Sequence, residues 1–321
     1  MGIKILGSGY CVPAAKLNNK QIESIVDTTD EWIFTRTGIS NRYIATTEDT
    51  TDLAYGAAKG AIESAAIDFD EIGLIIVATF TPEQLTPSTA CLIQARLGIS
   101  QPVIAFDMNA ACTGFVYALV TAEQFLKANP IKKALVIGAE VLSKIMDWND
   151  RSTCVLFGDG AGAAVIEYDG TPSPSFYLNC KGDEEGVLGT SKFPVNNPLY
   201  QTEITPISFH MHGAAVFKFA VTAIKETIEK LLKENQLTLE DIDLIIPHQA
   251  NKRIIDKVVK DLSASSEQFF LNVSEYGNTS AASIPIALNE AMNKQIVKSG
   301  DRVMLIGFGG GLTWGGCIVS I

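Results

Sequence analysis

The chain contains an internal duplication, and this feature constrains its fold more than any other. Three pairs of segments match in the same order and at nearly one spacing: DEIGLIIVA (70–78) with EDIDLIIPH (240–248), VIAFDMNAACTG with QFFLNVSEYGNTS, and ALVIGAE with VMLIGFG. A single spacing for three ordered matches predicts two copies of the same αβ unit. We therefore expect two halves, which span residues 1–172 and 173–321.

Four apolar runs in the first copy are predicted to be strands: Leu74–Ala78, Val103–Asp107, Ala134–Gly138 and Ala163–Glu167. Each run is continuous rather than alternating, which is typical of strands covered by helices on both faces. Helices are predicted at Thr51–Ala66 and Ala214–Lys233, and together these elements indicate an α/β layered architecture. The segment Gly170–Pro206 is rich in Pro, Gly and Asn, so we expect a loop-rich bridge between the halves.

Charge and hydropathy exclude several classes of function. The 321 residues carry a net charge of −11, which argues against a nucleic-acid-binding protein because such proteins normally present a basic surface. No apolar run approaches the roughly 20 residues that a membrane helix needs, and the first residues lack the pattern of a signal peptide. We expect a cytoplasmic protein without membrane contact. The six cysteines have no metal-ligand spacing, which favours free thiols and no bound metal.

Cys112 is the candidate nucleophile. It lies between a predicted strand that ends near Asp107 and a predicted helix. At such a corner the helix dipole stabilises a thiolate and lowers the cysteine pKa. Small neighbours leave space for a substrate carbonyl, toward which the backbone N–H of Cys112 can point. A buried structural cysteine is the commoner fate of a free thiol, so this segment alone leaves both interpretations open.

His248 and Asn278 occupy comparable positions in the second copy. His248 directly follows a predicted strand, so we expect it on the same side of the molecule as Cys112. Asn278 corresponds to the Cys112 corner, although a turn or a helix cap would also explain the GNTS segment. His210 and His212 form an H-x-H pair, but a metal site is disfavoured because no third ligand is nearby. Cys, His and Asn at equivalent strand ends favour one shared catalytic pocket.

Several motifs together resemble those of the β-ketoacyl-acyl-carrier-protein synthase III family, within the thiolase superfamily. They are, in chain order, TTDEWIFTRTGISNRYIA, PSTACLIQARLG, DMNAACTGF, FGDGAGA, PHQANKRI, YGNTSAASIP and GFGGGLTWG. The resemblance spans essentially the whole chain. The Cys, HQAN and GNTS motifs are specific in combination, whereas the glycine runs alone would carry little weight.

The resemblance implies a thiolase-like five-layered αβαβα fold built from two duplicated halves, a homodimer, and a catalytic triad of Cys112, His248 and Asn278. It also implies an oxyanion hole made by the backbone N–H groups of Cys112 and Gly310. By the same resemblance, Trp32, Arg36 and Arg151 correspond to the family's coenzyme A adenine and phosphate contacts. The pantetheine channel corresponds to Phe217, Ala250 and Asn251. Ala214 and Thr86 stand where some members carry Asn and Phe, so a pantetheine contact and the acyl pocket are expected to differ.

The implied reaction is a decarboxylative condensation of an acyl-CoA primer with malonyl-acyl carrier protein, which initiates fatty acid synthesis without a cofactor. Carrier proteins are acidic, so docking requires a local basic surface on this acidic chain. Arg253, Lys257 and Lys260 recur at helical spacing and so share one face, although a solvated face without a partner would look the same. The full candidate docking set is Lys218, Gln249, Ala250, Asn251, Lys252, Arg253, Lys257 and Lys260.

Other functions use related scaffolds. A thiolase would need a second catalytic cysteine, and the candidate, Cys317, lies inside the last predicted strand. A hydroxymethylglutaryl-coenzyme A synthase would need a glutamate directly after the strand IIVAT, where Phe80 stands and Glu83 is displaced. A non-catalytic partner subunit would have lost the nucleophile. A condensing enzyme or acyltransferase of secondary metabolism stays open, because the triad does not determine the acceptor.

Overall fold

The computed structural model describes residues 2–168, 170 and 176–321. The strands of the first half are β1 (Ile3–Cys11), β4 (Ile72–Ala78), β5 (Ile104–Met108), β6 (Lys133–Glu140) and β7 (Gly160–Tyr168). Those of the second half are β8 (Phe176–Cys180), β11 (Leu244–Pro247), β12 (Arg302–Gly309) and β13 (Thr313–Ser320). The predicted strands of the first half are therefore confirmed, and their observed ends differ from the predicted ends by at most three residues.

The two halves have the same strand order. The first runs β5–β4–β6–β7–β1, and the second runs β11–β12–β13–β8. A parallel bridge between Ile245 and Phe269 adds one more chain segment beyond β11. When the strands of each half are numbered in chain order, both sheets have the same spatial order: third, second, fourth, fifth, first. A single register pair, Lys4 with Ser320, joins the two sheets through β1 and β13.

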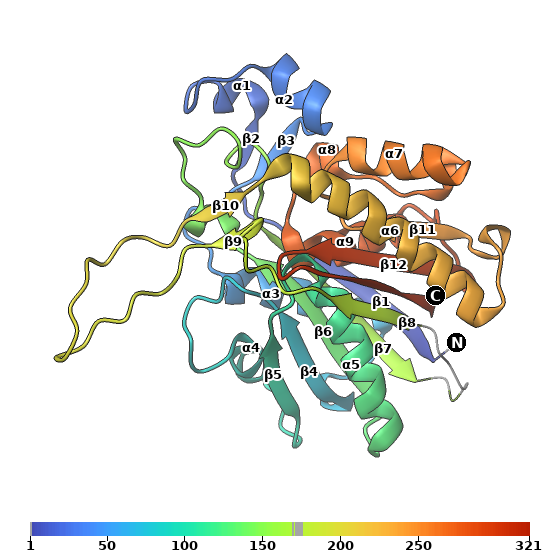
Figure 1. Cartoon of the computed structure of the whole chain (residues 1–321). Helices are drawn as coiled ribbons and strands as arrows, with labels where there is room; N and C mark the ends of the chain where they lie inside the picture. The colour runs from blue at the N-terminus through green and yellow to red at the C-terminus, as the bar shows by residue number, and fades with distance from the viewer. Residues whose placement is uncertain (1, 169, 171–175) are drawn as a thin grey trace.

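Helices cover both faces of each sheet and give the five predicted layers (Figure 1). The outer helices of the first half are α3 (Thr50–Ala65) and α4 (Thr89–Leu97), and those of the second half are α6 (Gly213–Asn235) and α7 (Lys252–Leu262). Each outer pair has its own apolar cluster with the sheet beneath it. Between the sheets lie α5 (Gly114–Ala128) and α9 (Ser283–Asn293), whose side chains pack against strands of both halves.

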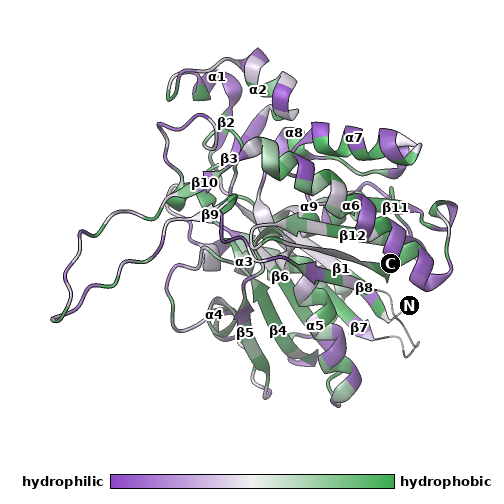
Figure 2. Cartoon of the chain, viewed as in Figure 1, coloured by the Kyte–Doolittle hydropathy of each residue, from purple (hydrophilic) through white to green (hydrophobic). Residues whose placement is uncertain are grey.

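Sequence patterns explain this layering. The α5 segment GFVYALVTAEQFLKA is apolar on almost every face, which is typical of a helix buried on all sides. The α7 segment KRIIDKVVKDL is instead strongly amphipathic and buries only Ile254, Ile255 and Val258. Figure 2 shows the same contrast, with apolar strands in the centre and polar residues on the outer side of α7. Within the described part of the chain, each helix is too short or too polar to cross a bilayer.

A small cap sits above the sheets near one end (Figure 1). It contains β2 (Lys16–Asn18), α1 (Asn19–Ile22), α2 (Asp30–Thr37) and β3 (Asn41–Tyr43). Helix α2 begins where the Thr29 side chain accepts a hydrogen bond from the Trp32 N–H, and it ends at Gly38, whose φ of 77° suits glycine. The buried Arg42 anchors the cap, because its guanidinium donates to the Val155 carbonyl at 2.6 Å.

The segment between the halves differs from the expected loop-rich bridge. It contains β8, which completes the second sheet, and β9 (Leu188–Thr190), which pairs with β10 (Phe209–Met211). The connection between β9 and β10 extends away from the body of the molecule (Figure 1). A short helix, α8 (Val273–Tyr276), precedes the Asn278 turn. The boundary expected between residues 172 and 173 lies outside the described residues.

Candidate active site

Cys112 lies where β5 passes into α5. A short 3-10 turn at Ala111–Thr113 separates the strand from the helix, and Ala111 takes a positive φ of 45°. The Sγ atom of Cys112 accepts a hydrogen bond from the Ser280 hydroxyl at 3.2 Å. Gly309 packs directly against this turn, since a Cβ atom there would lie 2.8 Å from the Cβ of Cys112. The absence of a side chain at Gly309 therefore leaves space for Cys112.

His248 follows the last residue of β11, and its backbone N–H continues the ladder to the Ile306 carbonyl at 2.7 Å. The ring is 1% exposed, stands edge-on to Phe308 at 5.0 Å between centroids, and has its Nδ1 atom 2.6 Å from the Ser283 hydroxyl. Burial lowers the pKa of His248 to about 3. The imidazole is consequently neutral at physiological pH.

Asn278 is held on both sides of its backbone. Its N–H donates to the Leu156 carbonyl at 2.8 Å, and its own carbonyl accepts from the Gly158 N–H at 3.0 Å. The side-chain Oδ1 accepts from the Ser280 N–H at 2.9 Å. With Oδ1 engaged in this turn, the amide nitrogen is the group left to donate to a ligand.

These three side chains line one cavity. Cys112, His248 and Asn278 all border an inner space of about 120 Å³. A second space of about 310 Å³, called the apolar compartment below, also borders Cys112 and has Gly310 on its wall. The two spaces share Cys112 and three apolar side chains, Phe157, Leu188 and Phe209. The thiol therefore borders two adjoining compartments that are both mainly apolar, and only the inner one also has His248 and Asn278 on its wall.

An outer recess of about 510 Å³ leads to the inner cavity. The two share Leu156, Gly213, Phe217 and Asn251, and Ala250 lines the inner cavity. Phe217, Ala250 and Asn251, which sequence analysis assigned to a pantetheine channel, thus line the route between surface and thiol. The Asn251 amide also ties two helices together, because it donates to the Arg36 carbonyl at 3.1 Å while Oδ1 caps α7.

Trp32 and Arg36 form part of the rim of the outer recess. The Arg36 guanidinium lies 4.7 Å from the Trp32 ring centroid, and that of Arg151 lies 5.1 Å from it. Arg151 also donates to the Asp27 carbonyl at 3.0 Å. The three residues predicted to contact a purine therefore gather around one indole. Ala214 also lines this recess, with a side chain too short to reach far into it.

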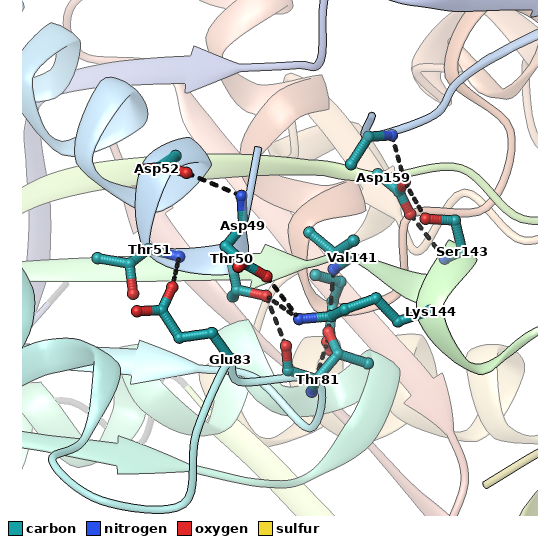
Figure 3. A network of polar contacts seen from close by, with 12 residues as sticks. Asp49, Thr50, Thr51, Asp52, Thr81, Glu83, Val141, Ser143, Lys144 and Asp159 are labelled. Atoms are coloured by element: carbon teal, nitrogen blue, oxygen red, sulfur yellow. Dashed lines mark hydrogen bonds and ion pairs between the residues drawn. The ribbon is translucent and has the colours of Figure 1, made fainter. Parts of the chain in front are cut away.

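A buried carboxyl group supports the wall of the apolar compartment. Glu140 ends β6, and its Oε2 accepts hydrogen bonds from the Thr81 hydroxyl at 2.5 Å and the Phe80 N–H at 3.3 Å. Phe80 lines the apolar compartment. Burial raises the pKa of Glu140 to about 8. Figure 3 shows the surrounding contacts, in which Thr81 links Val141 to Thr50.

The prediction of a lowered thiol pKa is wrong. Burial raises the pKa of Cys112 to about 12, and the hydrogen bond from Ser280 opposes that rise only in part. Removal of water disfavours the thiolate more than one donor stabilises it. The raised pKa therefore favours the thiol form of Cys112 at neutral pH.

One residue of the expected docking surface is wrongly assigned. Gln249 is 1% exposed, and its side chain is engaged with the Pro247 carbonyl and the Asn272 N–H. It orders the turn after β11 and cannot meet a protein partner. Two lysines on α7 are paired with acids on the same helix, Lys252 with Asp256 and Lys257 with Asp261. Among the described residues, Lys218, Arg253 and Lys260 are exposed and make no ion pair.

Several residues of the site escaped sequence analysis. Ser280 and Ser283 contact the proposed nucleophile and histidine, and the motif YGNTSAASIP contained both without distinguishing them from turn residues. In the sequence, Glu140 is only a charged residue at the end of an apolar run, and nothing there indicates that it is buried beside the site. The described residues contain no group of three His, Cys, Asp or Glu side chains that could hold a metal ion, so His210, which lies in β10, belongs to no such group.

Comparisons with known proteins identify relatives of this chain along most of its length. Residues 106–182 match the family model "3-Oxoacyl-[acyl-carrier-protein (ACP)] synthase III", and residues 232–321 match its C-terminal counterpart. The chain is 46% identical to a β-ketoacyl-acyl-carrier-protein synthase III of Clostridium perfringens over 323 residues, covering 99% of each chain.

Solved structures agree with this result. A 3-oxoacyl-acyl-carrier-protein synthase III from Aquifex aeolicus superposes with a TM-score of 0.90 at 45% identity, covering 99% of both chains. The priming β-ketosynthase of the R1128 polyketide pathway gives a TM-score of 0.92 at 33% identity, covering 100% of this chain and 96% of that one. The thiolase-like fold expected from the sequence is thereby confirmed, and the chain belongs to the β-ketoacyl-acyl-carrier-protein synthase III family.

Proposed function

We propose that this protein condenses an acyl-CoA primer with malonyl-acyl carrier protein, releases carbon dioxide and forms a β-ketoacyl-acyl carrier protein, the first condensation of fatty acid synthesis. The observation that carries the proposal is the shared cavity of Cys112, His248 and Asn278. Its connection to a recess bordered by Trp32 and Arg36 supports entry of a long pantetheine arm. Family membership supports the reaction class.

In the first half-reaction, the Cys112 sulfur attacks the thioester carbonyl of the acyl-CoA. The bond between the acyl carbon and the CoA sulfur breaks, and the thiol proton of Cys112 ends on the departing CoA thiol, so that no base is consumed. The backbone N–H groups of Cys112 and Gly310 are proposed to bind the developing oxyanion. Loss of one such donor typically costs about 3–4 kcal/mol. The acyl chain then occupies the apolar compartment beside Phe157 and Phe209.

In the second half-reaction, malonyl-acyl carrier protein enters after CoA has left. The bond to its carboxylate breaks, carbon dioxide leaves, and the electron pair moves into an enolate on the thioester oxygen. His248 and Asn278 are proposed to donate hydrogen bonds to that oxygen. The enolate carbon then attacks the acyl carbon on Cys112, the bond from that carbon to the sulfur breaks, and the departing thiolate takes up a proton from water to regenerate the thiol. A neutral imidazole is suited to this task because it donates without needing to be protonated first.

We propose that the carrier protein docks beside the mouth of the recess, on Lys218, Arg253 and Lys260. Arg253 itself lines the recess, and exposed cations steer an acidic partner toward the pocket. Lys252 and Lys257 contribute less, because Asp256 and Asp261 neutralise them locally. Reversing the charge at Arg253 should therefore raise KM for malonyl-acyl carrier protein more than for malonyl-CoA.

We further propose a cytoplasmic homodimer that needs no cofactor beyond its acyl-CoA substrate. Support for the dimer comes from large apolar side chains exposed to solvent in the connection between β9 and β10: Phe193, Val195, Leu199, Tyr200 and Ile204. Clustered exposed apolar side chains mark interaction surfaces. Light scattering coupled to size-exclusion chromatography tests this point, and a monomer at micromolar concentration would contradict it.

The test of the function separates the two half-reactions. Wild-type protein incubated with acyl-CoA should gain the mass of one acyl group, and Cys112→Ala should gain none. His248→Ala and Asn278→Ala should become acylated but fail to release carbon dioxide from malonyl-acyl carrier protein. Product analysis against malonyl-CoA, amines and alcohols identifies the acceptor. Equal loss of both half-reactions in all three variants, or transfer to amines without decarboxylation, would refute the proposal.

A further inference from the structure

Ser283 is a buried residue that the proposed mechanism does not use. It lies on the first turn of α9 and is 2% exposed. Two polar groups approach its hydroxyl oxygen within the described part of the chain: Nδ1 of His248 at 2.6 Å and the backbone N–H of Gln249 at 3.4 Å. The imidazole is thus joined through one serine to the helix between the two sheets.

The direction of the hydrogen bond between Ser283 and His248 follows from these two partners. The Gln249 N–H can only donate, so the serine oxygen accepts from it. Among the described residues the hydroxyl hydrogen has one acceptor within reach, which is Nδ1 of His248. If Nδ1 carried the proton instead, the hydroxyl would be a buried donor without a partner, which is strongly disfavoured. The arrangement therefore favours a hydrogen bond from serine to histidine.

We infer that Ser283 is a positioning residue that holds His248 as the Nε2–H tautomer, so that the imidazole presents a hydrogen-bond donor to the cavity. This inference rests on the function proposed above. It makes the decarboxylation step depend on Ser283, because the enolate oxygen needs a donor from His248. It leaves acylation of Cys112 largely independent of Ser283, because that step takes no proton through His248.

The tautomer can be read directly by nitrogen NMR. The chain has three histidines, so protein labelled with ¹⁵N-histidine gives few signals. The signals of His248 are assigned by their loss in His248→Ala. The inference predicts an unprotonated Nδ1 and a protonated Nε2 in the wild-type protein. A protonated Nδ1 would overturn it. In Ser283→Ala, the bond to Nδ1 is lost, and the Nδ1 signal should move toward that of a free imidazole.

Activity measurements supply the second readout. Ser283→Ala should lower kcat for malonyl decarboxylation about 10- to 100-fold, by analogy with other residues that orient a functional histidine. KM for malonyl-acyl carrier protein and the rate of acylation should stay within about threefold of the wild-type values. Ser283→Thr keeps the hydroxyl and should restore most of kcat.

Ser8→Ala is the matched control. Ser8 is also buried, and its hydroxyl bonds to Asn289 and Met292 on the same helix, far along α9 from His248. It should lower thermal stability to a similar extent and leave decarboxylation unchanged. An equal loss of kcat in Ser8→Ala and Ser283→Ala, or full decarboxylation by Ser283→Ala, would overturn the inference. If the wild-type protein did not condense acyl-CoA with malonyl-acyl carrier protein, the proposed function would be refuted. The NMR measurement would still test whether Ser283 sets the tautomer of His248.

Discussion

Replacing Gly309 by alanine perturbs the nucleophile without removing any functional group. A Cβ atom at Gly309 would lie 2.8 Å from the Cβ, 3.0 Å from the backbone N and 3.2 Å from the Sγ of Cys112. The shortest of these distances is about 0.6 Å inside the 3.4 Å at which ordinary contact begins. Gly309 is the last residue of β12 and is held in the ladder by Thr313. The strain therefore falls mainly on the turn that carries Cys112.

The expected losses in acylation rate and in folding free energy follow from that displacement. A shift of about 1 Å at a reacting group typically slows a reaction about 100-fold, so a shift near 0.6 Å should slow acylation about 10- to 100-fold, or roughly 1.5–3 kcal/mol. Overpacking of this size also costs about 1–3 kcal/mol of folding free energy. Both effects should appear together in Gly309→Ala, as slower acylation and a lower Tm.

The assay is the rate of acyl transfer from acyl-CoA to Cys112, followed by intact mass, beside thermal unfolding. Gly60→Ala is the control, because a Cβ at that helical position meets only the Cα of Gly9, at 3.5 Å. It should acylate at the wild-type rate with an equal or higher Tm, since alanine is the better helix former. Acylation by Gly309→Ala within twofold of wild type, at an unchanged Tm, would refute the reasoning about the turn.

Three further predictions concern the thiol, the recess and the buried acid. Because burial raises the pKa of Cys112 to about 12, its alkylation by iodoacetamide should accelerate about tenfold per pH unit up to pH 10; a plateau below pH 8 would contradict a resting thiol. Trp32→Ala should raise KM for acyl-CoA about tenfold with little change in kcat, because the indole contributes stacking and cation–π contacts at the rim; steady-state kinetics at varied acyl-CoA measure this, and a fall in kcat alone would speak against a binding role. Burial raises the pKa of Glu140 to about 8, so its stabilising effect is complete below pH 4.5 and is lost as the pH rises toward 8. The Tm of Glu140→Gln relative to wild type should therefore increase over that range, and a difference that is constant with pH would show that the carboxyl is already ionised.

Most of the fold could be predicted from local patterns. Continuous apolar runs located β4, β5, β6 and β7 to within three residues, because a strand that is buried on both faces leaves no room for polar side chains. The duplication predicted two units before any contact was known, and both sheets have one strand order. The strands β1 and β8 were missed. Each begins its half outside the repeated segments. Strand β1 mixes polar and small residues with apolar ones, and β8 has only five residues, so no periodicity distinguished either strand.

The candidate site was predictable only in part. Cys112 and His248 follow the ends of β5 and β11, as expected, and the topology of repeated units indicates that such ends meet. Asn278 instead follows the short helix α8, which the sequence did not predict. The exposure of Gln249, by contrast, was wrongly predicted, because nothing in PHQANKRI distinguishes a side chain that turns inward to bond with Pro247 and Asn272 from one that faces a partner.

The amino-acid sequence by itself determined the family, the repeated αβ unit and the residue types of the reaction, since these depend on patterns within short segments. Tertiary structure alone decided the protonation states and the contacts across the halves: Cys112 against Gly309 and Ser280, and His248 against Ser283. The physical reason is that a pKa depends on how much water the folded chain removes from a group, and a hydrogen bond between residues 168 positions apart depends on both halves being packed together.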